Sequence, residues 1–283
     1  MRYNNKNVLL PKIFVQLDEI WYTSSDGNIV TPNKESSLPT IVSNTYVNGK
    51  GVLKFTTNVT SIGSSAFNNC TGLTSIMFPN SVTSFGEFSF YGCTGLSTII
   101  IPSSVTSIED RAFEACSGLT SLSVEEGNTV YDSRNNCNAI IKTSNSILIL
   151  GCQNTIIPNN VARIGFGAFR FCTGLTSITF PDSVVHIMDY AFEGCKGLTN
   201  LLIGNSIKDI GSNAFHNCTG LTSVTIPVSV TEIYERAFYN CTSLTSISYT
   251  GTQWQYTDIV KWSDWHKNVP ATVVHCTDGD ISI

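Results

Sequence analysis

The side chains best suited to chemistry in this chain are those of its four histidines, its ten cysteines and a group of acidic residues near the C-terminus. No two histidines stand at the i, i+4 spacing that places two metal ligands on one helical face, since they occur at His186, His216, His266 and His275. Six possible cation ligands do cluster near the end of the sequence, at Asp264, His266, His275, Cys276, Asp278 and Asp280. A polar rim on a capping segment explains this cluster better, so we predict no metal ion and no cofactor.

Seven of the cysteines recur in one register, each followed three residues later by leucine: Cys70, Cys93, Cys116, Cys172, Cys195, Cys218 and Cys241. In stacked coils these side chains point the same way at a spacing of roughly 5 Å. Parallel thiols are poorly aimed for a disulfide bond, so we interpret the column as free, buried thiols that pack as small apolar residues. Cys137 and Cys152 flank an expected hairpin, and either a disulfide or two free thiols fits that pair.

Other catalytic and nucleic-acid-binding signals are missing from the sequence. Serine is frequent, but its positions repeat in every unit, whereas a nucleophile needs one serine with its own base. No glycine-rich phosphate loop or dinucleotide fingerprint occurs. We therefore predict no enzymatic activity and no catalytic residues. A net charge of -5 without a Lys/Arg cluster argues against nucleic acid as a partner, and no apolar run approaches the roughly 18 residues of a transmembrane segment.

A unit of 23 residues sets the framework for these positions. It reads Leu-x-x-Ile-x-(Phe/Ile)-Pro-x-x-Val-x-x-Ile-x-x-x-Ala-Phe-x-x-Cys and is clearest at residues 175–195. The first half alternates as a half-buried strand that ends at proline, and the Ala-Phe part predicts a short helical turn. Glycine stands two residues after every cysteine of the column except Cys241, where Ser243 takes its place, and predicts a turn with positive φ. A period of this length predicts a right-handed leucine-rich-repeat solenoid with one strand and one short helical turn per coil.

About nine coils follow from the expected strand centres, which are Leu53, Ile76, Ile99, Leu122, Ile157, Ile178, Leu201, Val224 and Ile247. One coil is enlarged by a predicted hairpin around residues 128–152, which replaces its Ala-Phe-x-x-Cys turn. Both ends depart from the repeat, as solenoid ends must. We therefore divide the chain into a β-rich N-terminal cap at 1–49, the solenoid at 50–249 and an irregular C-terminal cap at 250–283.

Three features together resemble the BspA-like leucine-rich-repeat proteins of bacteria and are similar to treponemal leucine-rich-repeat proteins. They are the repeat unit itself, the insertion from Tyr131 to Ile141, and the ending from Trp265 to Gly279. The resemblance covers residues 50–283, and the run from Ile20 to Val30 also looks like segments that precede such arrays. It implies a cell-surface or secreted protein of a kind that includes adhesins for host matrix proteins or other cells. It brings no catalytic residues with it.

Strand alternation identifies the side chains that point outward. Apolar residues stand on this hydroxyl-rich face at Met77, Ile100 and Leu202, with the polar neighbours Thr179, Asn200 and Thr225. A second ridge carries Arg163, His186, Asp209 and Glu232. A third surface carries aromatic residues outside the consensus, among them Phe166, Tyr190 and Tyr234. Isolated exposed apolar residues are common, but a row of them can anchor a partner.

The sequence thus favours a non-enzymatic protein-binding module of the adhesion type, with a host matrix or cell-surface protein as its partner. Carbohydrate binding is an alternative because the surface is rich in hydroxyl groups and poor in charge. A structural spacer or self-assembly module is another. The apolar stretch from Val8 to Val15, interrupted by Pro11 and Lys12, makes a poor signal-peptide core. The family resemblance therefore indicates the cell surface or secretion, while the sequence leaves the export route open.

Overall fold

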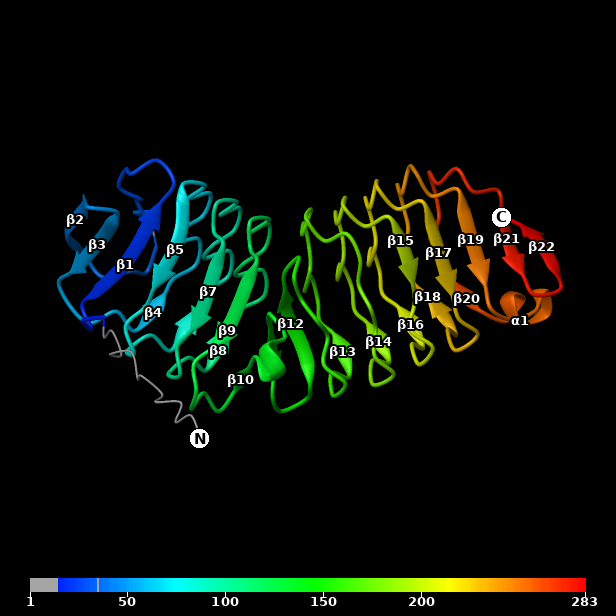
Figure 1. Ribbon diagram of the computed structural model, residues 1–283, viewed down its shortest axis with the longest axis horizontal. Helices are drawn as coiled ribbons and strands as arrows, with labels where there is room; N and C mark the ends of the chain where they lie inside the picture. Colours follow the sequence, from blue (N-terminus) through cyan, green and yellow to red (C-terminus); the bar gives the residue numbers. More distant parts are fainter. Residues whose placement is uncertain (1–14, 35) are drawn as a thin grey trace, which may run out of the picture.

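The computed structural model describes residues 15–34 and 36–283. They form an elongated solenoid in which successive coils stack along the long axis (Figure 1). The apolar stretch considered above as a signal-peptide core falls almost entirely in residues 1–14, outside the described part. Two helical segments occur in the described chain, η1 (Arg134–Asn136) and α1 (Gln253–Thr257), and both lie outside the regular repeats. No helix in the described ranges has the length and apolar character needed to cross a membrane.

Where a coil forms its first strand, that strand contributes to one of two sheets on the same side of the solenoid (Figure 1). The N-terminal sheet has six strands, in the order β2 (Ile41–Val47), β3 (Lys50–Phe55), β1 (Glu19–Ser24), β5 (Leu73–Met77), β7 (Thr98–Ile101) and β9 (Ser121–Val124). The C-terminal sheet has five strands, β15 (Asn200–Leu202), β17 (Ser223–Ile226), β19 (Ser246–Tyr249), β21 (Val273–Cys276) and β22 (Gly279–Ser282).

Two strand predictions, at Ile157 and Ile178, need correction. Leu53 lies in a strand, β3, as predicted, although β1 runs antiparallel between β3 and β5. Ile157 and Ile178 were expected at strand centres, but no strand is formed around either residue, so the face divides into two sheets there. The hairpin of β2 and β3 turns at Asn48 and Gly49, so it crosses the proposed boundary of the N-terminal cap at residue 49.

Short strands from the Val-x-x-Ile part of each coil form the opposite edge. One sheet of three strands contains β4 (Ser61–Ile62), β6 (Ser84–Phe85) and β8 (Ser107–Ile108). The other has eight strands, β10 (Tyr131–Asp132), β11 (Ala139–Lys142), β12 (Ile147–Gly151), β13 (Arg163–Ile164), β14 (His186–Ile187), β16 (Asp209–Ile210), β18 (Glu232–Ile233) and β20 (Val260–Lys261). Between the two sheets, the Tyr131 hydroxyl accepts the Ile108 N–H at 3.0 Å.

The short helical turn predicted for each coil takes the form of a run of hydrogen-bonded turns. Two residues per run have positive φ, for example Tyr190 at 58° and Gly194 at 69°, and such residues interrupt a right-handed helix. The turns also bond to one another along the solenoid, because the N–H of Phe192 donates to the carbonyl of Ala214 in the next coil at 2.7 Å. We call this repeated bonding between neighbouring turns the turn ladder.

The glycine column was predicted to have positive φ, and this is wrong. Gly118 and Gly220 have ordinary φ, while positive φ occurs three residues earlier, at Ala115 and Asn217. Glycine is needed for a different reason, since the preceding coil approaches its Cα closely. A Cβ on Gly118 would lie 2.3 Å from the carbonyl oxygen of Thr94, which no side chain tolerates.

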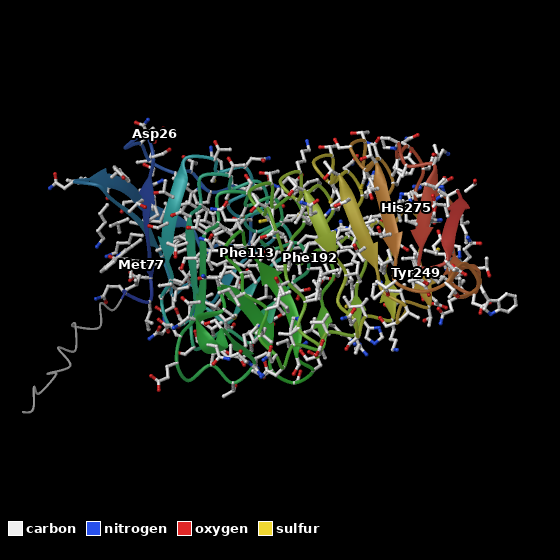
Figure 2. The ribbon with its side chains drawn as sticks, turned by 45° about the vertical axis from the view of Figure 1, so that its right-hand side comes forward. Asp26, Met77, Phe113, Phe192, Tyr249 and His275 are labelled. Atoms are coloured by element: carbon white, nitrogen blue, oxygen red, sulfur yellow. The ribbon has the colours of Figure 1, made fainter. Side chains whose placement is uncertain are left out.

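The phenylalanine of each turn points into the core and stacks on the equivalent ring of the next coil. Adjacent rings are nearly parallel, with centroids 4.9 to 5.2 Å apart, in two runs that are Phe67, Phe90, Phe113 and then Phe169, Phe192, Phe215, Phe238. Figure 2 labels one ring of each run, Phe113 and Phe192. The enlarged coil separates the two runs, and the buried core divides there into two clusters.

Every cysteine carries a free thiol, so the pair left open at Cys137 and Cys152 is unbonded. These two side chains belong to different core clusters. In five of the seven repeat-column cysteines the thiol donates to a carbonyl of the preceding coil, as Cys195 Sγ does to the Phe169 oxygen at 3.1 Å. Burial raises the pKa of the Cys172 thiol to about 12, so it stays protonated at neutral pH. The column thus acts as packing material that also links the coils.

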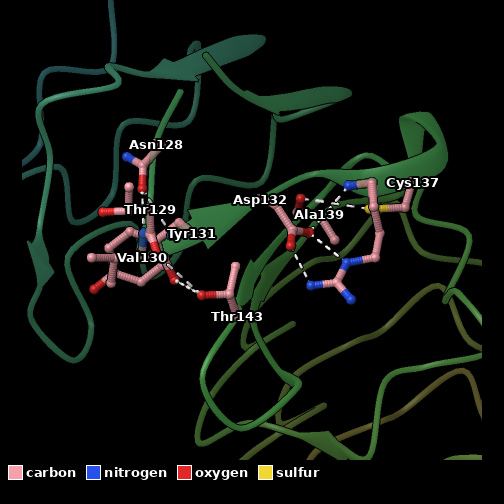
Figure 3. A network of polar contacts seen from close by, with 9 residues as sticks. Asn128, Thr129, Val130, Tyr131, Asp132, Cys137, Ala139 and Thr143 are labelled. Carbon is pink, nitrogen blue, oxygen red and sulfur yellow. Dashed lines mark hydrogen bonds and ion pairs between the residues drawn. The ribbon is translucent and has the colours of Figure 1, made fainter. Parts of the chain in front are cut away.

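The predicted hairpin is confirmed as β11 and β12, which pair antiparallel. The segment before it is tied to the preceding coil by Asn128, whose Nδ2 donates to the carbonyls of Pro102 and Val105, both at 2.9 Å. Asn128 Oδ1 in turn accepts the Tyr131 N–H at 2.8 Å, and farther on Arg134 pairs with Asp132 (Figure 3). The insertion is therefore an ordered part of the stack.

Candidate binding surface

An apolar row crosses the outer face of the N-terminal sheet. Pairing places Trp21 opposite both Val52 and Met77, and the register of Ser75 with Thr98 places Ile100 beside Met77. Met77 is 40% exposed and Ile100 is 46% exposed, while Val52 and Trp21 are half-buried. Alternate residues of the same strands, such as Ile20 and Ile76, lie in the core. We call the four residues Val52, Trp21, Met77 and Ile100 the apolar row.

A row of hydroxyl groups runs beside the apolar row on the same face. It consists of residues two positions away along each strand, Thr23, Ser75, Thr98 and Ser121. The hydroxyls of Thr23 and Ser75 lie 2.6 Å apart and so hydrogen-bond to one another. The face thus joins apolar contact area to neutral donors and acceptors, a combination that is common in protein interfaces.

Trp21 is held in place by charged neighbours. Its Nε1 donates to Glu19 Oε2 at 2.8 Å, and the Lys50 ammonium lies 3.0 Å from the centre of its ring. A fixed aromatic side chain loses little conformational entropy when it contacts a partner. The indole is therefore held in one orientation on the outer face.

Leu202, Asn200 and Thr225 lie apart from Met77 and Ile100, because they belong to the C-terminal sheet. Leu202 is 66% exposed and heads a row that continues with Thr225, Ser248 and His275. The side chain of Asn200 accepts the Ser223 hydroxyl at 2.6 Å. Thr179 is exposed in the strandless segment between the sheets. The predicted patch of three apolar residues is therefore divided, with Met77 and Ile100 together and Leu202 alone.

The aromatic candidates form two separate pairs. The rings of Phe166 and Tyr190 meet edge to face with centroids 5.4 Å apart. Tyr234 instead stacks on Trp262, which is 52% exposed, at 5.7 Å. The ridge predicted from Arg163, His186, Asp209 and Glu232 is confirmed as a row of paired strand residues, in which His186 Nδ1 lies 2.5 Å from Asp209 Oδ2.

A row of ionic groups follows the core phenylalanines on the turn side of the solenoid. Arg170 bonds to two carboxylates, Glu114 at 3.0 Å and Glu193 at 2.6 Å, and His216 lies 3.3 Å from Glu193. Both carboxylates are buried, and burial raises the pKa of Glu114 against the opposing influence of Arg170 and Arg111. Because the charges are paired with one another, this row links coils rather than offering a free reactive group.

The acidic and histidine residues near the C-terminus lie along the cap. His275 Nδ1 is 2.9 Å from Asp280 Oδ1, and Asp278 accepts the N–H of Gln253 at 2.7 Å. Within residues 15–34 and 36–283, no group of three or more His, Cys, Asp or Glu side chains is arranged to hold a metal ion. His275 and Asp280 thus pair with one another, while Asp278 binds the backbone of the cap.

Sequence reasoning missed Trp21 and Val52, the two residues that complete the apolar row. Trp21 precedes the array and Val52 stands at its very start, so the 23-residue register does not reach them. A signal was present in the alternation from Glu19 to Thr23, where Ile20 and Tyr22 point inward and Trp21 outward. What the alternation could not supply was the neighbour of that strand, since β1 pairs with β5 across 50 residues of chain.

Comparison with known proteins identifies the family. The family described as "BspA type Leucine rich repeat region" matches residues 40–147 and 149–257 in six copies. The chain belongs to the BspA-type leucine-rich-repeat family. The repeat unit and the solenoid seen here are those of this family, so the fold expected from the resemblance is confirmed. No curated protein matches the sequence significantly.

Several solved structures of bacterial leucine-rich-repeat proteins are similar to this chain. A leucine rich cell surface protein from Faecalibacterium prausnitzii is 32% identical, with a TM-score of 0.54, and the match covers 73% of this chain and 61% of that one. The leucine-rich repeat protein of T. pallidum is 25% identical, with a TM-score of 0.37 and coverage of 71% and 72%. This BspA-type chain thus spans less than two thirds of the Faecalibacterium protein.

Proposed function

We propose that the chain is a non-enzymatic, adhesion-type protein-binding module of a bacterial protein that is displayed at the cell surface or secreted. Membership of the BspA-type family supports this, as does the similarity to a protein described as a cell surface protein. The observation that carries the proposal is the apolar row, because solvent-exposed apolar residues aligned across a rigid sheet provide a binding anchor. The partner we propose is a protein of the host matrix or host cell surface.

The geometry of the N-terminal sheet favours a protein over a small ligand. Its outer face is open, and its rows of apolar and hydroxyl side chains extend across several strands. A partner that covers this face would bury Met77 and Ile100 at the centre and leave the hydroxyl row at the rim. That arrangement of an apolar centre and polar rim is typical of protein interfaces.

Carbohydrate binding remains the second candidate, and one observation favours it. Trp262 stacks on Tyr234 and remains 52% exposed, while Trp254 is 74% exposed nearby in sequence. Exposed aromatic rings can stack on sugar rings, and the hydroxyl-rich surface could supply hydrogen bonds. This candidate places the ligand at the C-terminal end, away from the apolar row.

A parallel binding screen tests both candidates. The purified, monodisperse protein is applied at physiological salt to immobilised matrix proteins and to a glycan array. A saturable protein ligand whose binding weakens in the Met77→Ser/Ile100→Ser variant supports the proposal. A glycan ligand that is lost in Trp262→Ala, with the apolar row irrelevant, supports the alternative. No binding on either panel argues for a spacer or self-assembly role. Light scattering over a concentration series would detect self-association.

A further inference from the structure

A cavity of about 300 Å³ lies where the enlarged coil lacks its Ala-Phe turn. It opens between the turn at residues 111–116 and strand β12 of the hairpin. Its walls are mixed, with apolar residues that include Ile108, Phe113, Ile149 and Leu150, and with charged residues such as Arg111 and Glu114. A volume of about 300 Å³ is at the lower end of the range for ligand pockets, and is suited to a side chain or a few residues.

The turn ladder stops at this cavity. In the preceding coil, the N–H groups of Phe90 and Gly92 donate to the carbonyls of Ala112 and Glu114, at 2.7 and 3.0 Å. The equivalent donors one coil later are the N–H groups of Phe113 and Ala115, and neither has an acceptor among the described residues. By the repeat of the ladder, both point toward the position of the missing turn. Phe113 is buried and lines the cavity, whereas Ala115 is half-buried and stands between two lining residues, Glu114 and Cys116. A buried backbone donor is rarely left without a partner.

On the C-terminal side of the cavity, the hairpin supplies the hydrogen bond that the missing turn would make. The N–H of Gly151, at the end of β12, donates to the Ala168 carbonyl at 2.8 Å and so takes the place of the missing phenylalanine in the ladder. Glycine brings no ring, and a Cβ there would lie 2.1 Å from a ring carbon of Phe169. The hairpin thus completes the ladder toward the C-terminus but leaves it incomplete toward the N-terminus.

The regular coils indicate which kind of segment fits the cavity. Each turn receives a segment whose central phenylalanine stacks on its own, with centroids 5.1 Å apart for Phe90 and Phe113. The carbonyls on either side of that phenylalanine accept the two donors. We propose that the cavity binds a peptide segment of another protein, with an aromatic side chain that stacks on Phe113 and flanking carbonyls that accept the N–H groups of Phe113 and Ala115.

The two arginines at the rim of the cavity are already engaged. Arg170 spans the gap to bond with Glu114 at 3.0 Å, and Arg111 lies between the rings of Phe88 and Phe166, 5.7 and 5.6 Å from their centres. These two arginines are thus already paired or covered, and a charged residue beside them would gain little and lose its hydration. Charged side chains of both signs, Glu109, Asp110 and Lys142, also line the cavity, so its lining does not select a peptide of one sign. This site is separate from the apolar row and does not depend on the proposed function of that row.

Peptides copied from a regular turn test the proposal. The probe is acetyl-Ser-Ala-Phe-Asn-Asn-amide, the sequence of residues 65–69, and its control has alanine in place of phenylalanine. They are titrated into the full, isotope-labelled chain and followed by NMR. We expect saturable shifts of the Phe113 and Ala115 amides and at least tenfold tighter binding of the phenylalanine peptide. Equal binding of the two peptides, or no saturation up to about 10 mM, would overturn the proposal.

Two further measurements keep the proposal testable even if one variant fails to fold. Leu150→Trp should fill the cavity and abolish peptide binding, whereas Leu202→Trp, at an exposed site of the C-terminal sheet, should leave it unchanged. In the unmodified protein, the amides of Phe113 and Ala115 should exchange with solvent at least tenfold faster than those of Phe90 and Gly92. They should become protected when the phenylalanine peptide is bound. Equal exchange of the two pairs in the free protein contradicts the open ladder on which the site depends.

Discussion

The N-terminal and C-terminal sheets are built from the same repeat but present different faces to solvent. Inward positions are interchangeable, since Leu53, Ile99, Leu201 and Val224 are all buried. Outward positions are not, because the N-terminal sheet shows the apolar row where the C-terminal sheet shows Leu202 followed by Thr225, Ser248 and His275. Packing constrains the first set and leaves the second free to vary, so differences between the faces point to function.

The two halves also end differently. At the N-terminal end β1 is inserted between β3 and β5, and this brings Trp21 onto the face. At the C-terminal end β22 simply extends the sheet beyond β21, and Trp265 closes the phenylalanine stack edge-on, 6.2 Å from Phe238. A cap can therefore add a side chain to the outer face as well as cover the core.

Core substitutions should lower the stability of both halves to a similar extent, and these are the largest effects that we expect. Phe90 and Phe215 each stack between two rings, so Phe90→Ala and Phe215→Ala should each lower the free energy of unfolding by about 3–5 kcal/mol. Denaturant unfolding, with hydrogen exchange to assign the loss to each half, measures this. A loss confined to one of the two variants would break the equivalence of the cores.

Replacing the column glycine by alanine should destabilise the regular coils but not the first coil. A Cβ on Gly118 or Gly220 would lie 2.3 or 2.2 Å from a carbonyl oxygen of the preceding coil, so alanine at either site should cost about 1–3 kcal/mol. On Gly72 the nearest atom would be 3.8 Å away, so Gly72→Ala should change stability by less than about 0.5 kcal/mol. Thermal unfolding of the three variants gives the answer, and equal costs at all three sites would refute the close-approach explanation.

Acid should loosen the C-terminal end selectively, with the smallest effect of the three. Burial lowers the pKa of His266 below its usual 6.5, and its Nδ1 is buried without a partner. The folded state therefore binds fewer protons than the unfolded state, so stability falls as pH drops below about 6.5, by less than about 1 kcal/mol. Hydrogen exchange at pH 7.5 and 5.5 should show faster opening near Trp265 but not near Phe90. If a His266→Asn variant keeps the full pH dependence of stability, a group other than His266 causes it.

Periodicity made the solenoid, its core and the free thiol column predictable, because each depends on residues that recur at fixed spacing. The phenylalanine stack and the hairpin at residues 139–151 follow directly from that pattern and its interruption. The exposed positions of Met77, Ile100 and Leu202 followed from strand alternation. That these residues bind a partner stays a prediction.

What the sequence could not provide depends on contacts outside the register. The insertion of β1 is an antiparallel pairing with β5 that no repeat position encodes. The glycine column was assigned to backbone conformation, whereas at Gly95, Gly118, Gly197 and Gly220 the cause is a carbonyl of the neighbouring coil. The strands expected at Ile157 and Ile178 are not formed, and they lie beside the enlarged coil, so Ile100 and Leu202 fall on separate sheets. The cavity likewise arises from how the hairpin sits against the turn before it.

The most direct test of the account compares the two faces against one ligand. Once the screen identifies a protein ligand, its affinity is measured for the unmodified chain, for Met77→Ser/Ile100→Ser and for Leu202→Ser, with unfolding transitions checked for each. We predict a loss of about tenfold to a hundredfold in the double variant, as for residues central to an interface, and less than about twofold in Leu202→Ser. An equal or larger loss in Leu202→Ser, or none in the double variant, would contradict recognition by the N-terminal sheet.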